Sequence, residues 1–253
     1  MLTKCLWVGL SSTDFRITKR IKMNLKLSII IVNYNVTQLL RNCLHSIEKY
    51  AEDVDYEVIV IDNKSTDNSW SDLISEFPKV HFIASEKNDG FAIANNKAIK
   101  TAKGEYLLIL NPDTELEGFY LNEILNFADS KTDFGCLGVR MHDANGNFLP
   151  ESKRSVPDMF NSFEKLFTNF KKKNSKSYYR NDVGEFEIAE VEVITGAFFL
   201  VKKEIYERVG GLDERYFMYG EDIDLCYTLL KNGLKNYYYG KSSILHHKGE
   251  STI

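Results

Sequence analysis

Strand-like and helix-like stretches alternate between residues 27 and 115 of this chain, and short loops connect them. The apolar runs have the length and character of strands that are buried on both faces of a parallel sheet. Helices between such strands act as crossovers, which are right-handed in nearly all proteins. The alternation therefore predicts an α/β fold with a doubly wound, mostly parallel central sheet flanked by helices. The expected strands are Leu27–Val32, Tyr56–Ile61, Val80–Ala84 and Tyr106–Leu110.

Three of these strands end in polar side chains. Asn33 and Asn35 follow the first strand, Asp62 follows the second, and Asn111 and Asp113 follow the fourth. Taken alone, each is explained equally well by a turn or a helix cap. In open α/β sheets, however, ligands bind at the carboxyl ends of the strands, and three polar ends on one edge favour a ligand site. A carboxylate there is a candidate ligand for a hard cation that would clamp a diphosphate.

Composition and motifs exclude several classes of protein. The first strand-to-helix turn reads NYNVT, and it has neither the GxGxxG of dinucleotide-binding folds nor the GxxxxGK[ST] phosphate loop. The net charge of −4 gives no indication of nucleic-acid binding. No apolar run approaches the roughly 20 residues of a membrane span. The four cysteines form neither a CxxC pair nor a Cys/His cluster, so we expect free thiols and a cytoplasmic protein.

The chain is expected to form one domain with two halves, residues 24–140 and 141–253, preceded by an extension. Residues 1–23 fit poorly with the rest of the chain, and we expect them to be dispensable, with Met23 close to the start of the fold. In the second half, Phe163, Phe167 and Phe170 have helical spacing beside several lysines. The favoured interpretation is a short helix packed on the body; the alternative is peripheral contact with the inner membrane surface.

Further candidates for a site lie in the last third of the chain. Gly196 interrupts the strand-like run 191–201, which suggests close passage of a ligand or another backbone. Glu221, Asp222 and Asp224 crowd the first turn of a predicted helix. Favourable interaction with the helix dipole, worth roughly 0.3–1 kcal/mol per charge, explains this equally well as a general base presented by the helix. Two adjacent histidines at 246–247 point to opposite faces of an extended segment, so one at most faces a given site.

Seven motifs occur in an order typical of one family: VNYN, VIDNKSTDNS, NDGFAIANNKA, LLILNPDTEL, TGAFFLVKKEIYERVGGLDERYF, GEDIDL and ILHHKGES. Together they resemble family 2 inverting glycosyltransferases with the GT-A fold, specifically the rhamnosyltransferase-like branch that builds bacterial surface polysaccharides. The resemblance runs from about Leu27 to Ser251. It implies that the first half binds the nucleotide-sugar donor, and that the second half binds the acceptor and carries the catalytic base.

The resemblance also implies roles for single residues. Asp113 takes the metal-binding place of the DxD motif, for Mg²⁺ or Mn²⁺, while Asn111 stands where that motif often has its first Asp. One carboxylate is therefore missing, and His246 is a candidate further ligand. The resemblance implies that Asp62, Asn33 and Asn35 contact the base and ribose of the nucleotide. It implies that Asn88, Gly90 and Asn95 line the donor pocket. Gly196 borders the acceptor, and Asp222 is the catalytic base, with Glu221 as the second candidate.

The expected reaction is transfer of a hexose or deoxyhexose from a nucleotide diphosphate sugar to a hydroxyl of a glycan or lipid-linked glycan, with inversion. Two rivals remain. A sugar-nucleotide pyrophosphorylase would carry a Gly-rich, basic first loop, which residues 33–37 lack. A non-catalytic binding protein would retain the fold without need of the carboxylates at 62, 113 and 222. We expect these three carboxylates to face one shared hollow.

Overall fold

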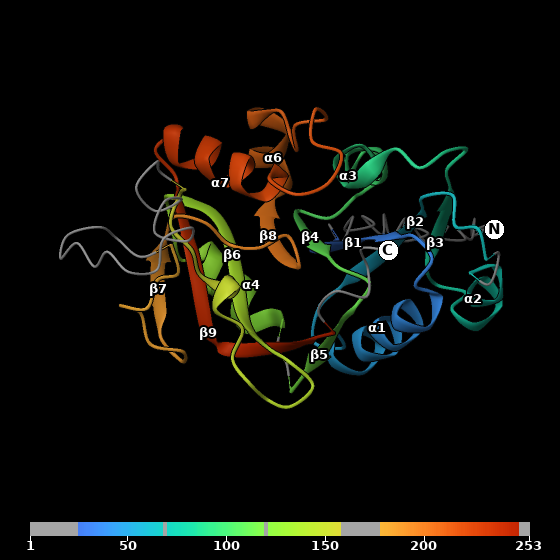
Figure 1. Cartoon of the computed structure of the whole chain (residues 1–253), viewed down its shortest axis with the longest axis horizontal. Helices are drawn as coiled ribbons and strands as arrows, with labels where there is room; N and C mark the ends of the chain where they lie inside the picture. The colour runs from blue at the N-terminus through green and yellow to red at the C-terminus, as the bar shows by residue number, and fades with distance from the viewer. Residues whose placement is uncertain (1–24, 68–69, 119–120, 158–177, 248–253) are drawn as a thin grey trace, which may run out of the picture.

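The computed structural model describes residues 25–67, 70–118, 121–157 and 178–247, through which one mixed sheet runs with helices on both faces (Figure 1). Its strands are β1 Leu27–Asn33, β2 Tyr56–Asp62, β3 His81–Ala84, β4 Tyr106–Leu110, β5 Thr114–Glu117, β6 Phe134–His142, β7 Ile188–Val191, β8 Phe198–Lys202 and β9 Lys235–His246. Its helices are α1 Thr37–Tyr50, α2 Ser71–Glu76, α3 Gly90–Ile99, α4 Leu121–Asp129, α6 Lys203–Val209 and α7 Glu221–Lys231, with a 3₁₀ helix, η1, at Pro150–Ser152.

The strands follow the order β3-β2-β1-β4-β8-β6-β9-β5, and β7 also pairs with β9. Four of them, β3, β2, β1 and β4, are parallel. β8 is antiparallel to both of its neighbours, whereas β6 and β9 are parallel to each other. The predicted α/β class with a mostly parallel sheet is thereby confirmed. Asn33 lies opposite Asp62 in the register, so two of the predicted polar strand ends are neighbours.

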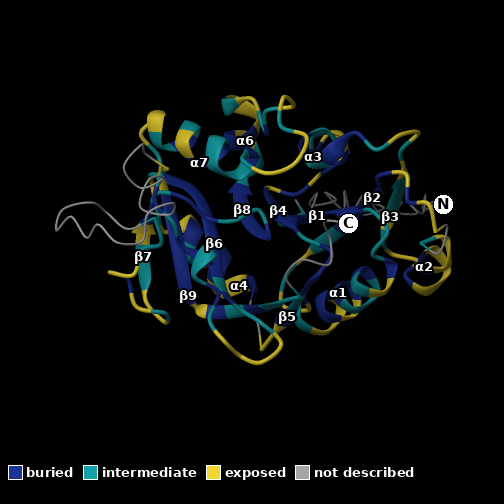
Figure 2. Cartoon of the chain, viewed as in Figure 1, coloured by how far each residue is buried: buried dark blue, intermediate teal, exposed yellow. Residues whose placement is uncertain are grey.

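Two apolar clusters form the core, one on each face of the sheet. Leu27, Ile29 and Ile31 of β1 belong to the cluster with α1, α2 and α4, while Ile30 and Val32 belong to the cluster with α3, α6 and α7. Successive side chains of a strand point to opposite faces, so a strand that is apolar at every position needs cover on both sides. Figure 2 shows the central strands as buried between the helices. This double cover leaves the ends of the strands as the place for a site.

The second half differs most from the prediction. The run 191–201 is not one weakened strand: β7 pairs with β9, and β8 pairs with β4 and β6. Gly196 lies in the segment that connects these two strands. The pattern also does not predict β5, because its partner is the far end of β9, residues 243–246, which is remote in sequence.

Two expectations concern residues outside the described ranges: the dispensable extension 1–23 and the aromatic and basic segment around 163–176. Cys43, Cys136 and Cys226 are free and buried. Among the helices that are described, none combines the length and the apolar character needed to cross a membrane.

Candidate active site

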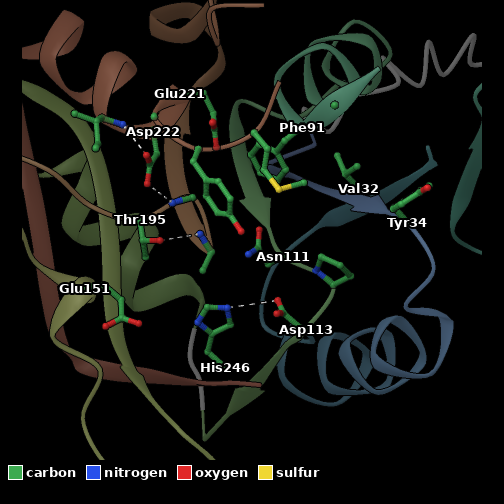
Figure 3. Close-up of a pocket in the computed structure, with 18 of the residues that line it drawn as sticks. Val32, Tyr34, Phe91, Asn111, Asp113, Glu151, Thr195, Glu221, Asp222 and His246 are labelled. Carbon is green, nitrogen blue, oxygen red and sulfur yellow. Dashed lines mark hydrogen bonds and ion pairs between the residues drawn. The ribbon is translucent and has the colours of Figure 1, made fainter. Parts of the chain in front are cut away.

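A cavity of about 500 Å³ lies where the carboxyl ends of β1 and β4 face the first turn of α7 (Figure 3). This volume is within the range of pockets that hold small ligands. The predicted residues Asn88, Gly90, Asn111 and Asp113 line this cavity. Gly196, Glu221, Asp222 and His246 also line it. The fold therefore brings most of the predicted site together from segments that are far apart in the chain.

Four predicted residues are outside this lining: Asn33, Asn35, Asp62 and Asn95. Asp62 is buried, and its Oδ1 accepts hydrogen bonds from Asn33 Nδ2 (2.8 Å) and Ser65 Oγ (2.6 Å). Its Oδ2 accepts a third from the backbone N–H of Ser65 (3.0 Å). A carboxylate that bonds the backbone three residues on is a common way to close a turn. Asp62 therefore holds the turn after β2 against the end of β1.

The expectation of three carboxylates in one hollow needs correction. Asp113 and Asp222 line the cavity, but Asp62 does not, because its oxygens are engaged by the turn that comes directly after it. Asn35 and Asn95 also have local partners. Asn35, at φ 57°, accepts a hydrogen bond from Thr66 N (2.8 Å), and Asn95 Nδ2 donates one to a backbone carbonyl of its own helix (2.9 Å).

Asn63, which the sequence does not single out, lines the cavity and connects the end of β2 to the residues around Gly90. Its Nδ2 donates to Asn88 Oδ1 (2.7 Å) and to the Gly90 carbonyl (3.2 Å). Its Oδ1 accepts a hydrogen bond from Asp89 N (3.1 Å). The end of β2 is thereby tied to the residues that begin α3.

Gly90 allows another part of the backbone to approach closely, and the approaching residue is Phe217. A Cβ on Gly90 would lie 2.3 Å from the Phe217 carbonyl oxygen, which accepts a hydrogen bond from Phe91 N (2.8 Å). Gly90 also has φ +79°, which favours glycine. Residues 217–219 are exposed, and Met218 and Tyr219 line the cavity. The start of α3 thus anchors the loop that precedes α7.

Asp113 and His246 form a pair on the side of the cavity opposite Glu221 and Asp222 (Figure 3). His246 Nε2 lies 3.5 Å from Asp113 Oδ1, and both side chains are largely buried. The adjacent His247 instead contacts Glu115 Oε1 at 2.8 Å, so one histidine of the pair faces the cavity, as expected. Within the described ranges no cluster of three or more metal-ligating side chains occurs. Asp113 and His246 could therefore supply two ligands, with the rest coming from elsewhere.

Asp222 is held by three donors at the start of α7. Its Oδ1 accepts a hydrogen bond from the N–H of Ile223 (2.8 Å). Its Oδ2 accepts one from Gly196 N (3.2 Å) and one from Arg154 Nη2 (2.6 Å). Gly196 therefore contacts the carboxylate directly through its backbone, which the sequence does not reveal.

Glu221 differs from its neighbour. It is only 6% exposed, and its Oε2 accepts no hydrogen bond from the described residues. Burial, together with the charge of Asp222, raises the pKa of the Glu221 carboxyl to about 7. Adjacent acids whose environments differ in this way are typical of sites that move protons.

Several lining residues belong to no motif in the sequence. Arg154, Glu151 and Tyr178 come from the irregular stretch 141–190, which carries no recognisable motif. Arg154 is the most important of them because it pairs with Asp222 across 68 positions of sequence. A basic residue in a Ser- and Pro-rich segment is the only local hint. The assembled cavity thus has the Asp222 carboxylate held by Arg154 on one side and the pair of Asp113 and His246 on the other.

Comparisons with known proteins find a matching family model, related sequences and a shared fold. Residues 28–210 match the family described as "Glycosyl transferase family 2". The chain is 29% identical over 239 residues to the "N-acetylglucosaminyl-diphospho-decaprenol L-rhamnosyltransferase" of Mycobacterium tuberculosis (strain H37Rv), covering 89% of this chain and 77% of the relative. It is 28% identical over 229 residues to "Rhamnosyltransferase WbbL" of Escherichia coli (strain K12), covering 87% and 82%.

A solved structure shares the fold. The crystal structure of GalNAc-T7 with UDP, GalNAc and Mn²⁺ superposes with a TM-score of 0.64 at 17% sequence identity. The match covers 89% of this chain and 44% of that one, so this chain spans less than half the length of that protein. At this identity the likeness establishes the GT-A-type fold alone.

Proposed function

This chain belongs to glycosyl transferase family 2, and we propose that it moves a hexose or deoxyhexose, with rhamnose as the first candidate, from a nucleotide diphosphate sugar to a hydroxyl of a growing surface glycan. The names of two relatives support rhamnose. Because decaprenol in one of these names is a lipid, we propose a lipid-linked acceptor and a reaction at the cytoplasmic face of the membrane. The observation that carries the proposal is the position of Asp222 in the cavity, across from Asp113 and His246.

We assign the base to Asp222. In an inverting transfer, the acceptor oxygen attacks the anomeric carbon, its proton passes to Asp222, and the bond to the diphosphate breaks with its electron pair leaving on the phosphate oxygen. One carboxylate suffices, because a single displacement needs no covalent intermediate. The start of α7 supplies a rigid support for that carboxylate. Gly196, on the segment before β8, presents its backbone N–H to the same group.

A divalent cation, Mg²⁺ or Mn²⁺, fits the opposite side. The donor set is a carboxylate and an imidazole whose atoms converge to 3.5 Å, and His246 Nδ1 has no hydrogen-bond partner among the described residues. Asp113 and His246 would hold the ion, and diphosphate oxygens and water would complete its shell. Bound there, the cation would stabilise negative charge on the leaving diphosphate. Because Asn111 stands in place of a carboxylate, we expect the affinity for the divalent cation to be low.

The donor is assigned to the side formed by the ends of β1 and β2 and the start of α3. Asn88 and Gly90 line the cavity there and would contact the donor directly. Asp62, Asn33 and Asn35 would shape the turns against which base and ribose rest, since their side chains bond mainly to each other and to Ser65 and Thr66.

The assignment of Asp222 as the base can be tested with a panel of nucleotide sugars. Their turnover is measured for the wild type, Asp222→Asn and Glu221→Gln. Asp222→Asn should lower the rate by roughly 10²–10⁴-fold, the usual contribution of a general base. Its thermal shift with donor and Mn²⁺ should match that of the wild type, because donor contacts lie elsewhere. Glu221→Gln is the matched control, one residue away. If Asp222→Asn transfers at the parental rate, the assignment is wrong; if only Glu221→Gln fails, the base is Glu221.

A further inference from the structure

We propose that Arg154 is a positioning residue for the base: it occupies Oδ2 of Asp222, so that Oδ1 is the atom that takes the acceptor's proton. This inference rests on the proposed function, because it assumes that Asp222 is the base. It adds a residue from the motif-poor stretch 141–190 to the site. Four observations support it: the anchoring of Arg154, the occupancy of the two carboxylate oxygens, the burial of the pair and the state of the neighbouring acid.

Arg154 is anchored at both ends. Its backbone N–H donates to the Val193 carbonyl and its carbonyl accepts from Val193 N, both at 2.9 Å. At the other end, Nη2 donates to the Ile194 carbonyl (2.8 Å) as well as to Asp222, and Nη1 donates to Tyr178 Oη (3.2 Å). The planar guanidinium presents its donors in a fixed fork, so these contacts determine where Asp222 Oδ2 lies.

The two oxygens of Asp222 are not equally available. A carboxylate has about four lone-pair sites, two on each oxygen. On Oδ2, Arg154 and Gly196 N–H occupy both. On Oδ1, Ile223 N–H occupies one. A hydroxyl that enters the cavity therefore finds its free acceptor site on Oδ1, and the rigid hold on Oδ2 fixes where that site points.

The burial of the pair gives the arginine a second effect. The side chains of Arg154 and Asp222 are 11% and 14% exposed, so solvent screens their charges weakly. Arg154 Nη2 lies 2.6 Å from Asp222 Oδ2, so the two charges form a close ion pair in this weakly screened environment. Loss of the arginine would leave the Asp222 carboxylate buried without its ion partner, which would weaken the hold on its position.

The charge of Arg154 also acts on Glu221, the acid next to Asp222. Burial and the Asp222 charge raise the pKa of Glu221, and Arg154 counters part of this rise. The ionisable groups whose pKa values respond to the charge of Asp222 are Arg154 from the segment after η1, Glu221 on α7 itself, and the Cys136 thiol on β6. Burial, with Cys226 and Asp222, raises the pKa of that thiol, so it stays neutral.

The kinetic test compares Arg154→Gln and Arg154→Lys with Arg180→Gln. Arg180 is the matched control because it pairs with Asp182 and is not part of the cavity lining. We expect Arg154→Gln to lower kcat by roughly 10²-fold, as small displacements of a reacting group do, with the donor KM changed less than about threefold. Arg154→Lys should retain only part of the wild-type kcat, because an ammonium group cannot reproduce the fixed arrangement of the guanidinium N–H donors. Added guanidinium ion should partly restore an Arg154→Ala variant, and Arg180→Gln should behave as the wild type.

The pH profile separates positioning from a merely structural role. Arg154 lowers the pKa of Glu221, the acid next to the base, so loss of the guanidinium should move the acid limb of kcat to higher pH in Arg154→Gln. An unchanged kcat and acid limb would overturn the inference. A raised donor KM with unchanged kcat would also overturn it, because Arg154 would then bind the diphosphate.

A measurement independent of activity distinguishes this inference from the proposed function. In a double-mutant cycle of unfolding free energies, the pair Arg154→Gln and Asp222→Asn should be non-additive, with the double variant more stable than the sum of the single losses predicts. Additive losses would show that Arg154 does not hold Asp222. A wild type that transfers none of the sugars tested would count against the proposed function alone, and the cycle would still decide the role of Arg154.

Discussion

Substitution of Gly90 by alanine tests whether the start of α3 supports the loop in front of α7. A Cβ on Gly90 would lie 2.3 Å from the Phe217 carbonyl oxygen and 2.8 Å from its ring. Neither contact can persist, and the carbonyl is backbone, so the loop itself must move. The loop continues into Met218 and Tyr219, which line the cavity beside Asp222. The change should therefore disturb the site as well as the fold.

The magnitude is the sum of three contributions. A side chain at φ +79° costs about 1–2 kcal/mol. Loss of the hydrogen bond from Phe91 N to Phe217 O costs about 0.5–1.5 kcal/mol more. The lower entropy of the unfolded alanine chain offsets about 0.4–1 kcal/mol. The net loss is roughly 2 kcal/mol, which corresponds to a fall in Tm of about 4–8 °C for a chain of this size.

Gly146→Ala is the matched control. Gly146 has almost the same backbone angle, φ +81°, but no atom lies within 4 Å of the Cβ that would be added. It should lose only the conformational contribution, about 1 kcal/mol or less. Thermal unfolding and transfer rates of both variants decide the matter. If Gly90→Ala and Gly146→Ala unfold at the same temperature and both transfer at the parental rate, then Phe217 is not packed on α3.

Two further predictions concern the charged groups of the cavity. The pKa of Glu221 is raised from 4.5 to about 7 in the folded protein, so the folded state binds that proton more tightly than the unfolded chain. As pH rises from 4.5 to about 7, the free energy of unfolding of the wild type should therefore fall relative to that of Glu221→Gln, by at most about 3 kcal/mol, and then level off. Thermal or urea unfolding of both proteins measures this difference. A difference that stays constant between these pH values would refute the raised pKa of Glu221. Asp113→Asn and His246→Gln should each weaken the Mn²⁺-dependent rise in Tm measured with a nucleoside diphosphate. Glu115→Gln, which removes the partner of His247, is the control and should leave this rise unchanged. An undiminished rise in Asp113→Asn and His246→Gln would place the cation elsewhere.

The first half of the fold is accessible from sequence because its signals are local. Each buried parallel strand is a short apolar run, and the polar residue that ends it is adjacent in the chain. Asn111 and Asp113 could thus be placed at a sheet edge from β4 alone. The same holds for Glu221 and Asp222, since a glycine and three acids mark the start of α7.

The remaining features depend on contacts between distant segments. Arg154 meets Asp222 across 68 positions, and β5 pairs with the last residues of β9. No local pattern records such a pairing. Asp62 shows the limit of a local pattern: a carboxylate at a strand end is expected to face the ligand, but Ser65, three residues later, hydrogen-bonds to it in a turn. The end of a strand therefore predicts the position of a polar residue in the fold, but it does not predict the hydrogen-bond partners of its side chain.

The most direct test of the proposed mechanism is the configuration of the product. Time-resolved ¹H NMR during transfer from the preferred nucleotide sugar, or during its slow hydrolysis, identifies the first-formed anomer before mutarotation. One base, Asp222, and a single displacement predict an anomer opposite in configuration to the donor. A first product with the configuration of the donor would contradict this mechanism, because it would require a second displacement and a nucleophile that the mechanism does not contain.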